Sequence, residues 1–169
     1  MNEEFDRFEE HMANEELEPY EVFAEQMETR FPKMFKESYG GFACGEGWWP
    51  ILESLCANIQ GHIDWRNETR SKLLKDNPYN HPIPDEVSQV TVRQIKEKFG
   101  GLRFYYDGGD DTVDGMVTMA ESWASRSCED CGSPATKQTS GWIKNVCDKH
   151  FNEIEERKAA QLEKYKKEL

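Results

Sequence analysis

Three cysteines and one histidine near the C-terminus have the types and the spacing of a metal site. Cys128 and Cys131 stand three residues apart, and Cys147 and His150 repeat that spacing after 15 intervening residues. Two thiolates at this spacing hold one tetrahedral ion from a tight turn, and Gly132, next in the chain, permits the positive φ that such a turn needs. The pattern therefore predicts one bound Zn²⁺ with Cys128, Cys131, Cys147 and His150 as its four ligands.

The residues around these ligand pairs predict the elements that position them. A turn near 140–141 divides the stretch between the pairs into a short β-hairpin, whose apolar side comes from Trp142, Ile143 and Val146. The second ligand pair begins a predicted helix, so both of its ligands lie on the first turn. The tight turn that carries the first ligand pair, Cys128 to Gly132, is a zinc knuckle. A knuckle followed by a hairpin and by ligands at a helix start resembles a treble-clef zinc finger. Four protein ligands close the coordination shell, which predicts a structural rather than a catalytic metal.

Free thiols in the core beside a surface histidine are the alternative interpretation of these four residues. It is disfavoured because charged residues flank both pairs and indicate exposed segments, namely Glu129, Asp130, Asp148 and Lys149. Nuclease forms of this finger carry a catalytic histidine on the hairpin strand, and residues 134–146 contain no histidine. The remaining histidines, His11, His62 and His81, have no acidic partner in a recognisable motif. The sequence therefore predicts no catalytic residue, and an enzyme is the least favoured functional class.

A basic segment, residues 87–106, stands out in an acidic chain. It contains one acid, Glu97, against four cations, which are Arg93, Lys96, Lys98 and Arg103. Two strand-like runs flank a Gly-Gly pair and predict a β-hairpin, on which Arg103 and Tyr105 share a face. Such a basic and aromatic face is a candidate site for a phosphate, a nucleotide or a nucleic acid. The alternative is intramolecular pairing of these cations with the acidic N-terminal helices.

The formal net charge of the chain is −12, and this charge is unevenly distributed. Residues 1–37 hold 12 Asp and Glu against 4 Lys and Arg, whereas the remaining residues hold 21 against 17. A net negative field argues against broad, non-specific nucleic-acid binding, which relies on basic surfaces. The acidic N-terminal face either docks on a basic partner or serves as a solvated surface that confers solubility.

Helical periodicity predicts four helices before the metal site. Residues 3–37 contain two of them, and Pro19 suits the first turn of the second. A third helix follows residues 48–50, whose two tryptophans form either a wedge between helices or, with the preceding residues, a binding loop. A fourth covers about 112–125 and is capped at Asp111 or Thr112.

These elements together predict an α+β fold. N-terminal helices precede a central β-hairpin or small antiparallel sheet, and a treble-clef-like zinc finger with a long terminal helix follows. The expected divisions are an acidic helical segment at 1–37, an α+β core at 38–126, and the finger with its helix at 127–169.

Three blocks of the chain carry a family resemblance. They are GFACGEGW at 41–48, KEKFGGLRFYY at 96–106, and the combination of 128–132, 141–143 and 147–150. With these blocks the chain resembles a family of small bacteriophage and bacterial proteins of uncharacterised function, and the second block is the most distinctive. The resemblance implies a phage-related origin and a fold formed in one piece, and it implies no particular activity.

The favoured function is that of a non-enzymatic, zinc-binding accessory protein of phage type, which binds a host macromolecule, in particular a protein, and inhibits or modulates it. The alternative is a nucleotide or nucleic-acid binder that uses the hairpin 87–106. An apolar run of 18 residues and a signal-peptide pattern are both missing, so we expect a cytoplasmic location in a bacterium or an infected host and no membrane partner. Five cysteines in such a compartment indicate metal ligands or buried thiols rather than disulfides.

Overall fold

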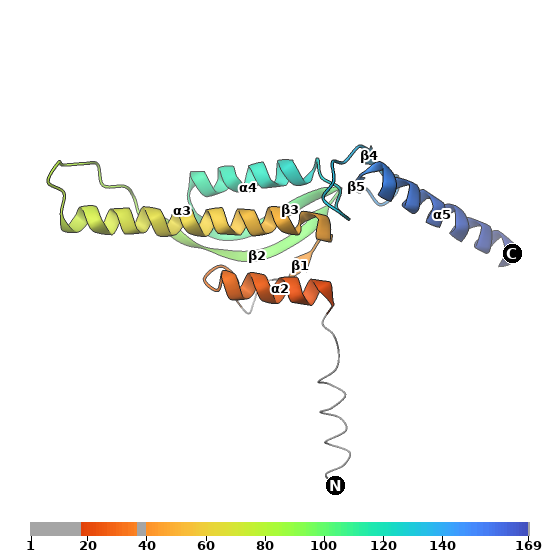
Figure 1. The fold of residues 1–169 in the computed structure, drawn as a ribbon, viewed down its shortest axis with the longest axis horizontal. Helices are drawn as coiled ribbons and strands as arrows, with labels where there is room; N and C mark the ends of the chain where they lie inside the picture. The colour runs from red at the N-terminus through yellow and green to blue at the C-terminus, as the bar shows by residue number, and fades with distance from the viewer. Residues whose placement is uncertain (1–17, 37–39, 169) are drawn as a thin grey trace, which may run out of the picture.

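A computed structural model gives the fold of the chain and describes residues 18–36 and 40–168. The elements in chain order are α2 (Pro19–Arg30), β1 (Phe42–Ala43), the 3-10 helix η1 (Glu46–Trp48), α3 (Trp49–Lys75), β2 (Ser88–Lys98), β3 (Gly101–Gly109), α4 (Asp111–Ala124), β4 (Lys137–Gln138), β5 (Asn145–Val146) and α5 (Asp148–Glu168). The predicted α+β class is confirmed (Figure 1). The first of the two predicted N-terminal helices lies outside the described residues.

The predicted central hairpin is present as the antiparallel pair β2 and β3. Phe99 and Gly100 form its turn with positive φ values of 54° and 77°, and glycine accepts such a conformation without steric penalty. The prediction of an antiparallel sheet is wrong in one respect, because β1 adds to β2 in parallel and makes the sheet mixed. A two-residue strand is too short to leave a period-2 pattern in the sequence, so β1 escaped detection.

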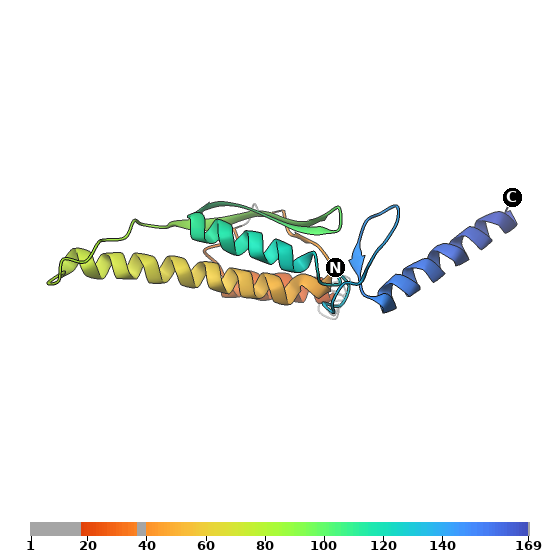
Figure 2. The ribbon, with the colours of Figure 1, turned by 90° about the horizontal axis from the view of Figure 1, so that it is seen from above.

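Two helices, α3 and α4, cover one face of this sheet, and Figures 1 and 2 show them side by side along the strands. A bulge between Val92 and Gln94 shifts the strand phase, so Val90, Val92 and then Ile95 all point into the core. Leu102 and Phe104 of β3 also point into the core. The residues that alternate with them, Arg103 and Tyr105, therefore share the outer face, as predicted. The core therefore lies between the hairpin and the two helices.

The helix α2 closes the core at the N-terminal end of α3. Pro19 occupies its first turn, as predicted. Phe23 stacks on Trp49 with ring centroids 4.5 Å apart and meets Phe42 edge-on at 5.0 Å. Met27 is also fully buried, so one apolar cluster joins α2 to the remainder of the body.

The N-cap of α4 is Asp110 rather than the predicted Asp111 or Thr112. Its carboxylate accepts hydrogen bonds from the backbone amides of Thr112 and Val113, both at 3.1 Å. The strand β3 runs on through Gly108 and Gly109, so the predicted turn after the hairpin is shorter than expected and the helix begins one residue earlier.

The last helix, α5, extends away from the body (Figure 2) and contacts mainly the short strands β4 and β5. Its side chains beyond the second turn are largely exposed, including Leu162 and Tyr165. None of the helices in the described part of the chain combines the length and the apolar character needed to cross a membrane.

Candidate metal centre

The structure brings the four predicted ligands together at the junction of the body and α5. The donor atoms of Cys128, Cys131, Cys147 and His150 all lie within 4.8 Å of one another. Cys128 Sγ is 3.3 Å from His150 Nδ1, Cys147 Sγ is 3.5 Å from the same nitrogen, and the sulfurs of Cys131 and Cys147 are 3.9 Å apart. These four side chains can hold one metal ion.

Three of the six donor separations are close to the edges of a tetrahedron around a metal ion of zinc's size. Metal distances of about 2.3 Å to sulfur and about 2.0 Å to nitrogen require ligand atoms roughly 3.5–3.8 Å apart, close to the observed 3.3, 3.5 and 3.9 Å. The ligating nitrogen would be Nδ1, and the other ring nitrogen of His150 lies 3.9 Å from Glu153 Oε2. Outer carboxylates in such positions orient metal-binding histidines.

The turn that carries the first ligand pair is closed by backbone hydrogen bonds. The Gly132 amide donates to the Cys128 carbonyl at 2.8 Å, and the Cys128 amide donates to the Ser133 carbonyl at 2.7 Å. Gly132 adopts a φ of 75°, as predicted for the residue after the pair. The backbone of this turn thereby holds the two cysteines toward the same point.

The pKa values of the two thiols in this turn shift in opposite directions. Hydrogen bonds from the side chain and backbone of Ser133 lower the pKa of Cys131 to about 6. Burial raises the pKa of Cys128, and backbone hydrogen bonds offset only part of that rise.

The second ligand pair is positioned as the sequence predicts, by a hairpin and a helix start. The strands β4 and β5 pair in antiparallel fashion around a turn at Gly141, whose φ is 82°. The Phe151 amide donates to the Cys147 carbonyl at 2.9 Å and closes the first turn of α5. One prediction for this hairpin is wrong, because Trp142 does not pack on its apolar side and is 76% exposed.

The expectation that both ligand segments are exposed is wrong for Glu129. This residue is only 5% exposed, and burial raises the pKa of its carboxyl group although Lys144 opposes that effect. One carboxylate oxygen accepts a hydrogen bond from the Gly45 amide at 3.2 Å, and the other lies 3.5 Å from Lys144 Nζ. The buried acid therefore links the metal turn to the loop before α3.

This loop, residues 44–48, supports the metal turn through backbone contacts that sequence reasoning missed. The Gly47 amide donates to the Glu129 carbonyl at 2.8 Å. A Cβ at Gly47 would collide with backbone atoms of Cys128, Cys131 and Gly132, so only glycine fits at this position. The two glycines of the loop were the available signal, but the sequence does not say which segment they approach.

Trp48 and Trp49 act as core residues, as the wedge interpretation predicts. Trp48 is fully buried and donates through Nε1 to the Ser127 carbonyl at 3.1 Å, while Trp49 stacks on Phe23. The indole hydrogen bond ties the body to the residue just before the metal turn.

The central hairpin also contacts the metal-binding module. Asn145 Nδ2 donates to the Gly100 carbonyl at 2.8 Å. A Cβ at Gly100 would lie 3.2 Å from Ile143, so the two hairpin turns pack closely. The three blocks that carry the family resemblance thus meet in space around the metal turn.

The five predicted ligand-binding residues lie along the hairpin, and several already have partners. Arg93 pairs with Asp107, and Arg103 lies 3.6 Å from Glu121. Lys96 and Lys98 sit over the rings of Tyr105, at 5.3 Å, and of Phe99, at 5.7 Å. Among the described residues, the acids that pair with Arg93 and Arg103 come from β3 and α4. Most of the acids of the N-terminal helices, with which the alternative interpretation pairs these cations, lie outside the described residues.

Two further cysteines, Cys44 and Cys56, and one histidine, His62, are titratable groups near the core. Burial raises the pKa of Cys44 to about 12, with a smaller contribution from Glu129. Burial also raises the pKa of Cys56, so both thiols stay neutral and serve as packing residues. His62 does have an acidic partner, contrary to expectation, because its Nε2 lies 3.0 Å from Asp110 Oδ2.

Comparisons of the chain with protein-family models, with curated proteins and with solved structures give no match in any of the three. The resemblance to small bacteriophage and bacterial proteins therefore stays a prediction from the three sequence blocks. The chain's own geometry shows a four-donor cluster braced by two segments of the body.

Proposed function

We propose that the protein is a zinc-stabilised, non-enzymatic accessory protein of phage type that binds a host protein and modulates it. The ion is assigned as Zn²⁺ because three thiolates and one imidazole in a tetrahedral arrangement are the donors that structural zinc prefers. The order of the elements, a knuckle followed by β4, β5 and the start of α5, favours the treble-clef type. Four protein donors leave no open position, which favours a structural metal.

The observation that carries the binding role is an apolar groove between α3 and α4. Its cavity volume is about 480 Å³, and Ile51, Leu55 and Met116 contribute to its floor and walls. Met119 and Trp123, on the rim, are 68% and 66% exposed. Large exposed apolar side chains that cluster around a groove mark protein-interaction sites, and tryptophan is enriched among the residues that dominate binding energy.

Charge favours a basic, amphipathic partner helix in this groove. The two helices around the groove, residues 49–58 and 111–124, contain four acids and no lysine or arginine; the acids are Glu53, Asp111, Asp114 and Glu121. They flank the groove rather than line it, and Glu53 and Glu121 also pair with Arg30 and Arg103. Two packed helices with an apolar seam between them accept a third helix through contacts spaced by three or four residues. We assign the occupant as a helix of a host protein that has an apolar stripe and basic flanks.

A photo-crosslinking amino acid placed at position 119 tests this assignment. In bacterial host cells it should form an adduct with one host protein, whereas the same amino acid at Trp65, exposed on α3 outside the groove, should not. The captured protein is then purified and titrated against the wild type and two variants. Trp123→Glu should weaken binding by about thirtyfold or more, and Trp65→Glu should leave the affinity within about twofold.

Two outcomes would overturn the proposal. In one, the adduct at position 119 is a second copy of the chain, and sedimentation shows a dimer that Trp123→Glu dissociates. In the other, the purified partner binds Trp123→Glu and the wild type equally well. Either outcome leaves the metal assignment intact, because the groove contains none of the four candidate ligands.

A further inference from the structure

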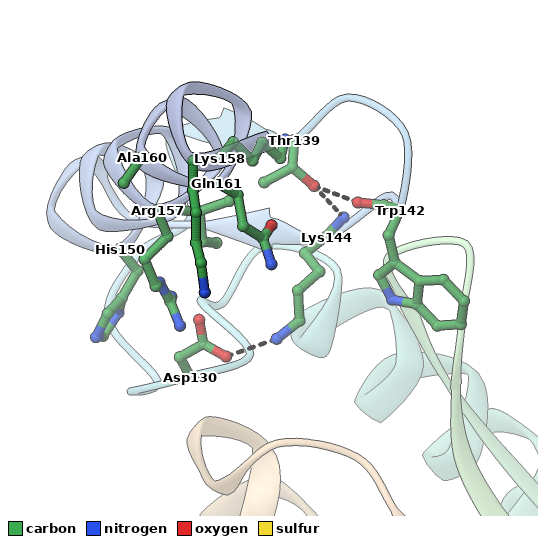
Figure 3. A pocket seen from close by; sticks show the side chains of 11 residues that line it. Asp130, Thr139, Trp142, Lys144, His150, Arg157, Lys158, Ala160 and Gln161 are labelled. Atoms are coloured by element: carbon green, nitrogen blue, oxygen red, sulfur yellow. Dashed lines mark hydrogen bonds and ion pairs between the residues drawn. The ribbon is translucent and has the colours of Figure 1, made fainter. Parts of the chain in front are cut away.

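A second surface, distinct from the α3/α4 groove, lies between the metal-binding module and α5. It is a cleft of about 910 Å³, which we call the cationic cleft. Its lining includes one carboxylate, Asp130, against four cations, namely Lys144, Arg157, Lys158 and Lys164. Figure 3 shows Arg157, Lys158 and Gln161 extending from α5 into the cleft toward Lys144 and Asp130. The charge of this cleft is opposite to that of the whole chain.

Two of these cations are held by local partners. Lys144 Nζ lies 2.7 Å from Asp130, and Lys158 pairs with Glu155 at 2.8 Å. In the part of the chain that the structure describes, the other two, Arg157 and Lys164, have no carboxylate within ion-pair distance. They stand seven residues apart on α5, roughly 10 Å along the helix axis. The cleft therefore presents two separated positive charges that an extended polyanion can satisfy.

Two exposed aromatic rings adjoin the cationic cleft, one in its lining and the other across a smaller hollow. Trp142, which lines it, is 76% exposed, and Phe99, at the tip of the neighbouring hairpin, is 75% exposed. A smaller hollow of about 310 Å³ separates the two rings, and one acid and one cation, Glu97 and Lys98, also line it. The hydrogen bond from Asn145 to the Gly100 carbonyl fixes the two hairpin turns against each other. The rings are thus exposed although their backbones are held rigidly.

We propose that the cationic cleft and these two rings form a binding site for single-stranded nucleic acid. Phosphates of the strand contact Arg157 and Lys164, and bases stack on Trp142 and Phe99. An acidic peptide would satisfy the cations but would leave both rings in water, so a ligand with anionic groups and flat aromatic bases fits the surface better. The site stands independently of the docking groove on α3 and α4.

The net charge of −12 sets the expected strength of this binding. Repulsion by the rest of the chain keeps the affinity moderate, with a dissociation constant on the order of 10 μM in about 50 mM salt. Two or three phosphate contacts predict a slope of log K against log salt of about −1.4 to −2. Affinity and salt slope together distinguish this site from the broad basic surfaces of general nucleic-acid binders.

Fluorescence anisotropy with the full chain and labelled oligo(dT) or oligo(U) of about 12 nucleotides tests the proposal. Arg157→Glu and Lys164→Glu should each weaken binding about tenfold or more, whereas Lys167→Glu, on the same helix but outside the cleft, should change it less than about twofold. Trp142→Ala and Phe99→Ala should each weaken binding about fivefold or more, against no change for Trp65→Ala, also exposed. Metal content measured for each variant shows that the fold is kept.

Three results would overturn the proposal. The first is that neither oligonucleotide binds at about 100 μM protein in low salt. The second is that oligo-glutamate of similar length competes as strongly as an unlabelled strand, which would reassign the cleft to acidic peptides. The third is that both charge reversals weaken binding while neither aromatic variant does so, which would reduce the site to an electrostatic patch.

Discussion

The body and the metal-binding module stabilise their chain segments by different means. The body, from α2 to α4, buries one continuous cluster of large side chains that includes Trp48, Ile59 and Leu102. The module, residues 127–150, buries few apolar side chains, among them Val146, and it also buries the polar Ser127 and Glu129. A segment this short removes little apolar surface from water, so we expect a metal held by the four candidate ligands to supply the missing free energy.

The contrast extends to how the two regions are joined. Their interface consists mainly of backbone contacts and hydrogen bonds, such as those of Gly47 with the metal turn and of Trp48 with the Ser127 carbonyl. The strength of such contacts depends on the exact positions of the backbone atoms rather than on the apolar area that they bury. We therefore expect the body to remain folded without the module, and the module to depend on both the metal and the body.

Metal removal should have the largest effect. Structural zinc contributes on the order of 10 kcal/mol to folding of small sites, so a chelator or Cys147→Ser should unfold the module while β2 and β3 keep their slow amide exchange. Hydrogen–deuterium exchange and metal analysis by mass spectrometry measure both effects, with about one zinc per chain expected for the wild type. Cys44→Ala, a change at a cysteine that is not a predicted ligand, should retain the metal.

The opposite result would also be informative. If no zinc is found, the metal assignment fails. If the amides of β2 and β3 lose protection together with the module, the body and the module form one cooperative unit and the body does not fold independently of the metal.

A cavity in the body should have the next largest effect and should leave the metal in place. Ile59 on α3 is fully buried, so Ile59→Ala should lower the free energy of unfolding by about 2–5 kcal/mol. Leu74→Ala, on the exposed end of the same helix, should change it by less than about 0.5 kcal/mol. Urea unfolding followed by circular dichroism measures both, and loss of zinc from folded Ile59→Ala would show that core packing controls the site.

The junction between the two regions should respond to a single methyl group. Gly47→Ala forces the loop away from the metal turn and should cost about 1–3 kcal/mol, with weaker zinc retention against a chelator. Gly61 is the matched control because a Cβ there meets no atom within 4 Å. As a mid-helix glycine, Gly61→Ala should stabilise the protein by about 0.5–1 kcal/mol. Equal zinc retention in both variants would show that the loop at residues 44–48 does not support the metal site.

The sequence predicted the local parts of this architecture well. Pairs of ligands at a spacing of three, the Gly-Gly hairpin and the helix that starts after Cys147 depend on neighbouring residues, and each is found in the structure. The predicted start of α4 differs from the observed one by only one residue. Either Asp110 or Asp111 can cap the helix, and the sequence alone does not show where β3 ends.

The features that sequence reasoning missed depend on contacts between distant segments. Glu129 is buried because distant residues supply its partners: the Gly45 amide, 84 residues before it, donates a hydrogen bond, and Lys144 on the β4–β5 hairpin forms an ion pair. Strand β1 exists only because β2 offers it an edge. Trp142 is exposed because the hairpin that carries it packs through Ile143 and Val146 instead. Contacts between such distant partners leave no trace in the residue types or in the hydrophobic periodicity of the sequence.

The smallest expected effect tests how the body anchors α4, far from the metal. Burial raises the pKa of Asp110, but hydrogen bonds from His62 and from the amides of Val113 and Thr112 lower it more, so the net pKa is depressed. A carboxyl group with a depressed pKa in the folded state stabilises the protein above its unfolded pKa of about 4 and loses that contribution as the pH falls through the folded value. Asp110→Asn keeps a capping oxygen but loses the charge.

Asp110→Asn should therefore lower stability by about 1 kcal/mol at neutral pH and flatten the decline in stability below about pH 4. Asp111→Asn is the matched control, since Asp111 is exposed and contacts neither His62 nor the helix amides through its side chain. Thermal melting of both variants across this acid range measures the slope. The zinc content of Asp110→Asn at neutral pH should equal that of the wild type, because the anchor of α4 belongs to the body alone. An unchanged acid slope in Asp110→Asn would show that other carboxylates control the acid stability of the body.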